Sequence, residues 1–67
     1  MGNLLVQIFE IVSSHTGLEG RMKLASRTGV PRTKAQELED TPELVEKFKK
    51  EASEILKADI ETFLRGA

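Results

Sequence analysis

The residues best suited to covalent chemistry are two serines and the single histidine, which are adjacent at Ser13, Ser14 and His15. A serine nucleophile needs a base within hydrogen-bond distance, and that base needs a third group to orient it. Consecutive residues of a helix point in different directions, and no carboxylate is spaced to orient the imidazole. We therefore expect a polar helix end, with His15 close to the negative end of the helix dipole, and no catalytic residues.

The same region offers no complete metal or phosphate site. His15 and Glu19 provide two potential metal ligands, but a Gly-containing corner separates them and two ligands do not complete a site. Gly17, Gly20 and Gly29 lack the Gly-Lys-Ser/Thr sequence and the preceding strand of phosphate-binding loops. The sequence has no Cys, which excludes disulfides, thiolate-bound zinc and iron–sulfur clusters. We expect a protein that is not an enzyme and that uses no cofactor.

Charged residues are segregated along the chain, although the net charge is only −1. Residues 21–34 contain bases and no acid, whereas residues 35–46 contain acids and no base. The bases are Arg21, Lys23, Arg27, Arg32 and Lys34, and the acids are Glu37, Glu39, Asp40, Glu43 and Glu46. A local excess of positive charge is able to bind phosphates. The alternative interpretation is two solvated faces that pair with each other.

The stretch from Arg21 to Asp40 has the residue types of a corner between two helices. Leu24 is apolar and Ala25 is small, which allows a following helix to cross close by. Gly29 follows Ala25 by four residues, where the turn needs a residue that adopts positive φ. Val30 is then placed to fill the core after the turn.

A short helix from Pro31 to about Glu39 is expected after this turn. Proline suits the first helical position because its missing N–H would be unpaired there. Ala35 and Leu38 lie three residues apart and give the segment an inward face. In these features the stretch resembles the helix-turn-helix of bacterial DNA-binding proteins.

The resemblance implies binding to double-stranded DNA, with the second helix in the major groove. The residues that it assigns to nucleic acid are Arg21, Lys23, Arg27, Arg32, Thr33, Lys34 and Gln36. Arg32, Thr33 and Gln36 would face the bases, and Arg21 the phosphate backbone. The remaining bases would add a salt-dependent attraction. Against this pattern, Glu37 and Asp40 fall on the side of the helix that would face DNA, where carboxylates repel phosphates.

Two apolar helices are expected before the turn at Gly29. The first runs from about Asn3, a suitable N-cap, to Ser14 and stops near Gly17. Its apolar residues recur at helical spacing and are Leu4, Leu5, Ile8, Phe9 and Val12. The second begins between Thr16 and Gly20, with Thr16 and Glu19 spaced as a capping box. The residues expected on its apolar face are Leu18, Met22, Ala25 and Thr28, with Leu24 beside them. We expect the methionine to fill space in the core.

The clearest helix signal begins at residues 40–43, Asp-Thr-Pro-Glu, which supply a cap, an N1 proline and a first-turn acid. The apolar stripe that follows contains Leu44, Phe48, Ala52, Ile55, Ile60, Phe63 and Leu64. Either one helix runs to Arg65, or Asp59 caps a separate last helix.

These elements predict an all-α protein, a small compact bundle of three to four helices that forms a single domain over residues 1–67. A chain of this length buries only about 60% of its unfolded surface, so its core is thin. The long stripe from Leu44 to Leu64 would therefore suit a homodimer interface. The apolar run from Leu4 to Val12 is too short to span a membrane, and we expect a cytoplasmic protein.

Two functions follow from the sequence. One is a helix-turn-helix-like DNA-binding protein, such as a transcriptional regulator, that acts through residues 21–40. The other is a small helical protein-interaction or assembly module with no nucleic-acid role. They differ in whether the basic segment 21–34 is used.

Overall fold

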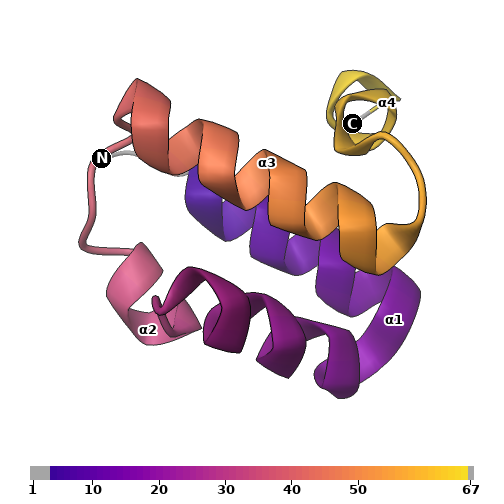
Figure 1. The fold of residues 1–67 in the computed structure, drawn as a ribbon, viewed down its shortest axis with the longest axis horizontal. Coiled ribbons are helices and arrows are strands. Elements are labelled where there is room, and N and C mark those ends of the chain that lie inside the picture. The colour runs from indigo at the N-terminus through magenta and orange to yellow at the C-terminus, as the bar shows by residue number, and fades with distance from the viewer. Residues whose placement is uncertain (1–3, 67) are drawn as a thin grey trace.

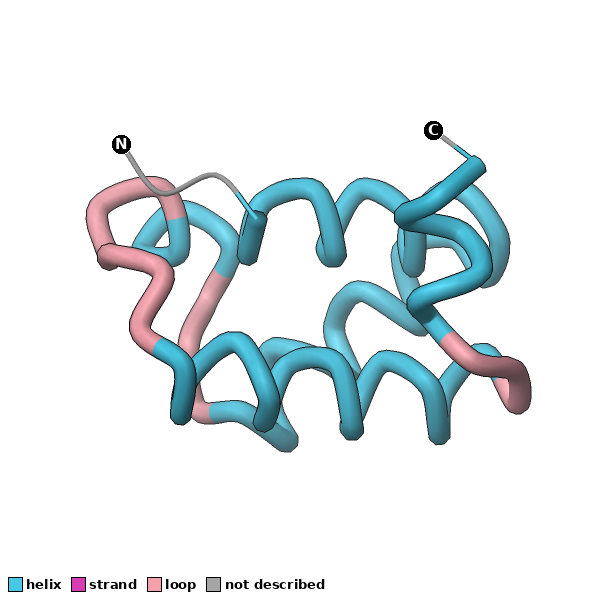
Figure 2. The backbone as a smooth tube through the Cα atoms, turned by 90° about the horizontal axis from the view of Figure 1, so that it is seen from above, coloured by secondary structure: helices cyan, strands magenta, loops and turns pink. Residues whose placement is uncertain are grey.

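The computed structural model describes the backbone of residues 4–66 and the side chains of residues 4–64. These residues form four helices: α1 (Leu4–Thr28), α2 (Arg32–Ala35), α3 (Pro42–Leu56) and α4 (Ile60–Gly66). No strand is present in the described part of the chain, so the predicted all-α bundle is confirmed. The loops around α2 lie at one end of the bundle and the α3–α4 loop lies at the other (Figure 2).

Helix α1 is divided into two halves at Gly17. The backbone of this glycine has φ 76° and ψ −165°, which lies outside the helical region. Glycine adopts such a positive φ more readily than any other residue. The first half, residues 4–16, lies behind α3, and the second half, residues 18–28, turns back beneath it (Figure 1). The predicted end of the first helix near Gly17 is thus confirmed.

The predicted capping box at Thr16 and Glu19 is wrong. The Thr16 hydroxyl donates a hydrogen bond backwards to the Val12 carbonyl at 2.6 Å. Residues on both sides of the break are helical, so the threonine closes the end of the first half rather than opening the second. A short side chain that hydrogen-bonds its own preceding turn is a common competitor of capping geometry.

The core lies where the first half of α1 meets α3. Its fully buried apolar side chains are Leu5, Ile8, Phe9, Val12, Leu24, Ala35, Phe48, Ala52 and Ile60. At its centre the rings of Phe9 and Phe48 meet edge to face with centroids 5.5 Å apart. Such a pair adds about 0.5–1.5 kcal/mol to the free energy gained by burying the two rings. The apolar stripes of the first and last segments therefore pack against each other.

The segment after residue 40 forms two helices. Thr41 is the N-cap of α3, and its hydroxyl accepts a hydrogen bond from Leu44 N–H at 3.4 Å. The helix ends at Leu56, and its C-cap, Lys57, adopts the left-handed conformation with φ 58°. Asp59 Oδ1 then accepts from Glu61 N–H at 3.0 Å in the first turn of α4, as expected for a separate last helix.

Helix α2 is shorter than the predicted segment from Pro31 to Glu39. Pro31 is the N-cap, with φ −70° and ψ 158°, and only the four residues Arg32–Ala35 are helical. Ala35 is buried, whereas Leu38 is half-buried in the turn that follows. So few apolar contacts do not offset the cost of ordering further helical turns.

Over the described residues, no helix combines the length and the apolar character that crossing a bilayer requires.

Candidate interaction surface

Two of the residues predicted to bind DNA are engaged in ion pairs within the bundle. Arg27 Nη1 lies 3.3 Å from Glu51 Oε1 and 3.1 Å from Glu54 Oε1, so this arginine links the second half of α1 to α3. Arg32 Nε donates to Glu10 Oε2 at 3.0 Å and links α2 to the first half of α1. These carboxylates reduce the positive field that both arginines would present to phosphates.

None of these three acids belongs to the acidic segment 35–46. The interpretation that the basic and acidic segments pair with each other therefore finds no ion pair among the described residues. Asp40 instead accepts a hydrogen bond from Leu4 N–H at 3.2 Å, so it serves the beginning of α1. The predicted N-cap of this helix, Asn3, lies outside the described residues.

The other predicted DNA-binding residues come from two elements. Arg21, half-buried, and Lys23, exposed, lie on the second half of α1. Thr33 and Lys34 are exposed on α2, and Gln36 is exposed at its C-cap. Four helical residues extend only about 6 Å along the helix axis, so α2 offers a short edge to any groove.

The second half of α1 buries only part of the face that the sequence suggested. Its buried residues are Gly20, Leu24 and Thr28, at intervals of four, whereas Leu18 and Met22 are 59% and 62% exposed. The expectation that Met22 fills the core is therefore wrong. The buried threonine is tolerated because its hydroxyl donates to the Leu24 carbonyl at 2.8 Å.

Gly20 explains why this face turns inward. A Cβ atom built on Gly20 would lie 1.6 Å from Thr16 Oγ1, 2.5 Å from Thr16 Cβ and 3.3 Å from Val12 Cγ1. The two halves of α1 therefore approach each other more closely than any side chain at this position would permit. The repeat of Gly20, Leu24 and Thr28 at four-residue spacing was the signal in the sequence for this packing.

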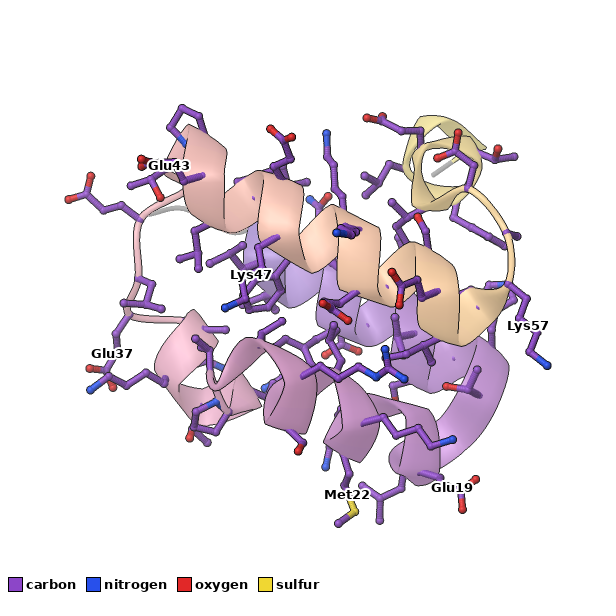
Figure 3. All side chains as sticks on the ribbon, viewed as in Figure 1. Glu19, Met22, Glu37, Glu43, Lys47 and Lys57 are labelled. Atoms are coloured by element: carbon purple, nitrogen blue, oxygen red, sulfur yellow. The ribbon has the colours of Figure 1, made fainter. Side chains whose placement is uncertain are left out.

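An open hollow follows the outward face of the same helix. It is lined by Leu18, Glu19, Met22, Lys23 and Ser26, which we call the Leu18–Met22 face. Glu19 and Met22 project from the side of the bundle opposite α3 (Figure 3). Leu18 and Met22 are the exposed large apolar residues of the described chain. The face thus combines an unpartnered apolar centre with one acid and one base.

The stripe predicted as a dimer interface is largely used inside the chain. Leu44, Ile55 and Phe63 are half-buried and pack against the core, as do Val45, Leu56 and Leu64. The homodimer through this face stays a prediction, but the exposed large apolar side chains of the described residues, Leu18 and Met22, lie on α1.

His15 makes only structural contacts. Its Nδ1 lies 3.0 Å from the Ile11 carbonyl oxygen. Its ring packs edge to face against the ring of Phe63 in α4, with the two ring centroids 4.5 Å apart. No group of three residues suited to hold a metal ion occurs in the part of the chain that the structure describes.

No protein-family model matches the chain, and no curated protein or solved structure is significantly similar to it.

Proposed function

We propose that the protein is a small helical protein-interaction module that binds through the Leu18–Met22 face. The observation that carries this proposal is the exposure of Leu18 and Met22, at 59% and 62%, one turn apart on one helix. Neither of them belongs to the apolar core or to the partly buried residues packed against it. Large apolar residues grouped on a surface are typical of contact sites.

The free energy available at this face is sufficient to contribute to binding. Complete burial of a Leu or Met side chain is worth about 1.5–3 kcal/mol. More than half of each side chain remains exposed, so a partner that covers both gains on the order of 2–3 kcal/mol from them. The neighbouring Glu19 and Lys23 add charged groups at the rim, which favour one orientation of the partner.

DNA binding, the other function predicted from the sequence, would depend on fewer groups than the basic segment suggested. Arg27 and Arg32 already contact carboxylates. Lys23 and Lys34 are exposed bases in two separate elements, and α2 has four residues. Protein interaction is therefore the better supported function.

Site-specific crosslinking in the native cells tests the proposal. A photoreactive amino acid in place of Met22 is expected to give a discrete protein adduct, and the same group in place of the exposed Lys50 of α3 is the matched control. Equal adducts from both positions, or none from position 22, would contradict the proposal.

A titration with duplex DNA tests the other function. We expect no binding that weakens between low and physiological salt, because few bases remain available for phosphates. Salt-dependent binding that is lost when Lys23 and Lys34 are both replaced by Ala would favour DNA binding instead.

A further inference from the structure

We propose that the occupant of the Leu18–Met22 face is a second copy of this chain, packed antiparallel about a two-fold axis that passes close to Met22. The inference rests on the proposed function and specifies its partner. It follows from the order of apolar, acidic and basic residues around the second half of α1.

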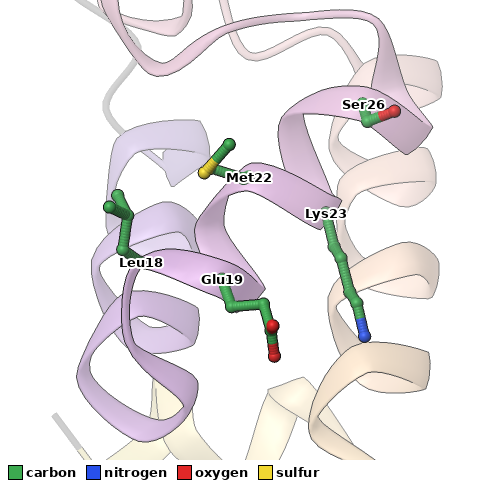
Figure 4. A pocket seen from close by; sticks show the side chains of 5 residues that line it. All are labelled: Leu18, Glu19, Met22, Lys23 and Ser26. Carbon is green, nitrogen blue, oxygen red and sulfur yellow. The ribbon is translucent and has the colours of Figure 1, made fainter.

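The face has a ridge and a charged flank. Leu18, Met22 and Ser26 recur every four residues and form a ridge on the side of the helix opposite its buried residues. Glu19 and Lys23 follow the same flank of that ridge, one turn apart, and their side chains extend in the same direction (Figure 4). Acid and base thus lie on either side of Met22 along the helix.

A two-fold axis perpendicular to the helix makes this arrangement complementary to itself. Such an axis brings the charged flank of one copy against the same flank of the other, with the direction of the helix reversed. Glu19 of each copy then lies opposite Lys23 of the second copy, which gives two identical charge pairs. The ridges meet along the same line, so Met22 packs against Met22 close to the axis.

A parallel arrangement lacks this complementarity. Its two-fold axis runs along the helices and brings the charged flank against the opposite flank, where the neighbouring charged residue is the half-buried Arg21. Arg21 lies midway between Glu19 and Lys23 along the helix, so its repulsion of Lys23 offsets its attraction to Glu19, and the parallel pair gains nothing from its charges. The charge order therefore selects the antiparallel pair.

The size of the face implies weak association. The face comprises five residues between positions 18 and 26 of one helix, far fewer than the roughly 20–30 residues that each partner contributes to a stable complex. We therefore expect a reversible dimer that is detected by sedimentation over about 10 µM to 1 mM protein.

Charge reversal tests the pairing with the full chain. Glu19→Lys alone and Lys23→Glu alone each place like charges at both contacts, and each is expected to weaken self-association at least tenfold. An equimolar mixture of the two variants restores opposite charges at both contacts and is expected to form the heterodimer. The double variant, with both changes in one chain, is expected to self-associate like the unmodified protein.

The exposed Glu46 and Lys50 of α3 have the same four-residue spacing and provide the matched control. Glu46→Lys and Lys50→Glu are expected to leave the association constant unchanged. Thermal unfolding of every variant by circular dichroism checks that the monomer still folds. Because all four positions are exposed, we expect the melting temperatures to agree within a few degrees.

The outcomes separate this inference from the proposed function. If the unmodified protein stays monomeric up to about 1 mM, or if the mixture of single variants does not associate, the second copy is excluded as the occupant. A crosslinked adduct from position 22 with a mass other than that of the dimer would then still support the interaction module. Loss of both self-association and crosslinking would overturn both.

Discussion

Gly20→Ala is the substitution that tests the packing of α1 most sharply. The added Cβ would lie 1.6 Å from Thr16 Oγ1 and 2.5 Å from Thr16 Cβ, whereas ordinary contacts are 3.4–4 Å. Rotation of the threonine side chain about its Cα–Cβ bond moves the hydroxyl and the methyl group and breaks the 2.6 Å hydrogen bond to Val12, while the Cβ atom stays in place. The two halves of α1 must therefore separate by about 1 Å or more, which opens the core that they share.

The sign of the change in the free energy of unfolding distinguishes this close contact from a glycine with free space around it. At an exposed helical position, alanine in place of glycine stabilises by about 1 kcal/mol. Overpacking of a tight contact costs about 1–3 kcal/mol, and separation of the two halves adds lost burial at Val12 and Leu24. We expect a net loss of about 1–2 kcal/mol, which lowers the melting temperature by roughly 5–15 °C for a domain of this size.

Thermal and urea unfolding followed by circular dichroism measure this loss. Ser26→Ala, at an exposed position of the same helical half, is the control and is expected to change the free energy of unfolding by less than about 0.5 kcal/mol. Thr16→Gly removes both clashing atoms, so Gly20→Ala should cost less in that background. A higher melting temperature for Gly20→Ala alone would refute the close approach.

Three further substitutions test other parts of the structure by the same unfolding measurements. Lys57→Gly should raise the free energy of unfolding by about 1 kcal/mol, because Lys57 holds φ 58° and glycine adopts this conformation without strain; a decrease would contradict this. Arg32→Ala removes the contact with the exposed Glu10 and should lower the free energy of unfolding by only about 0.2–1 kcal/mol. Salt screens an exposed ion pair, so this loss should be smaller at high salt, and a loss that does not depend on salt would contradict the ion pair. Leu18→Ser together with Met22→Ser should leave the melting temperature within a few degrees of the unmodified protein, since both side chains are exposed, and a large drop would show that they belong to the core.

Most of the helical framework could be predicted because local signals and apolar spacing agreed. The stripe of Leu5, Ile8 and Phe9 packs against Phe48 of the last stripe, as the helical period required. Gly17 ends the first half of α1 by the positive φ expected of a glycine at a helix end. Where residue type and period point to the same face, sequence alone locates the core.

Apolar spacing predicted the inward face of residues 18–28 only in part. Leu18 and Met22 have the greater hydrophobicity, but the close approach of the two halves of α1 favours the small Gly20 and the hydrogen-bonded Thr28. Tertiary packing thus decided which face is buried.

The Leu18–Met22 face could not be predicted from the sequence for a related reason. Spacing indicates which residues share a face, but not whether the chain itself covers that face. Leu18 and Met22 are exposed because Gly20, Leu24 and Thr28 form the side of this helix that packs against the rest of the bundle. Likewise, the basic segment gave no indication that Arg27 and Arg32 would meet acids distant in sequence. DNA binding through this segment stays a prediction.

The concentration dependence of backbone amide chemical shifts tests most directly whether the Leu18–Met22 face is the binding surface. Between about 10 µM and 1 mM protein, we expect changes that are centred on residues 18–26 and absent from α2 and from residues 44–64. Those changes should disappear in the Glu19→Lys variant. Constant shifts throughout, or changes centred on residues 44–64, would contradict self-association through this face.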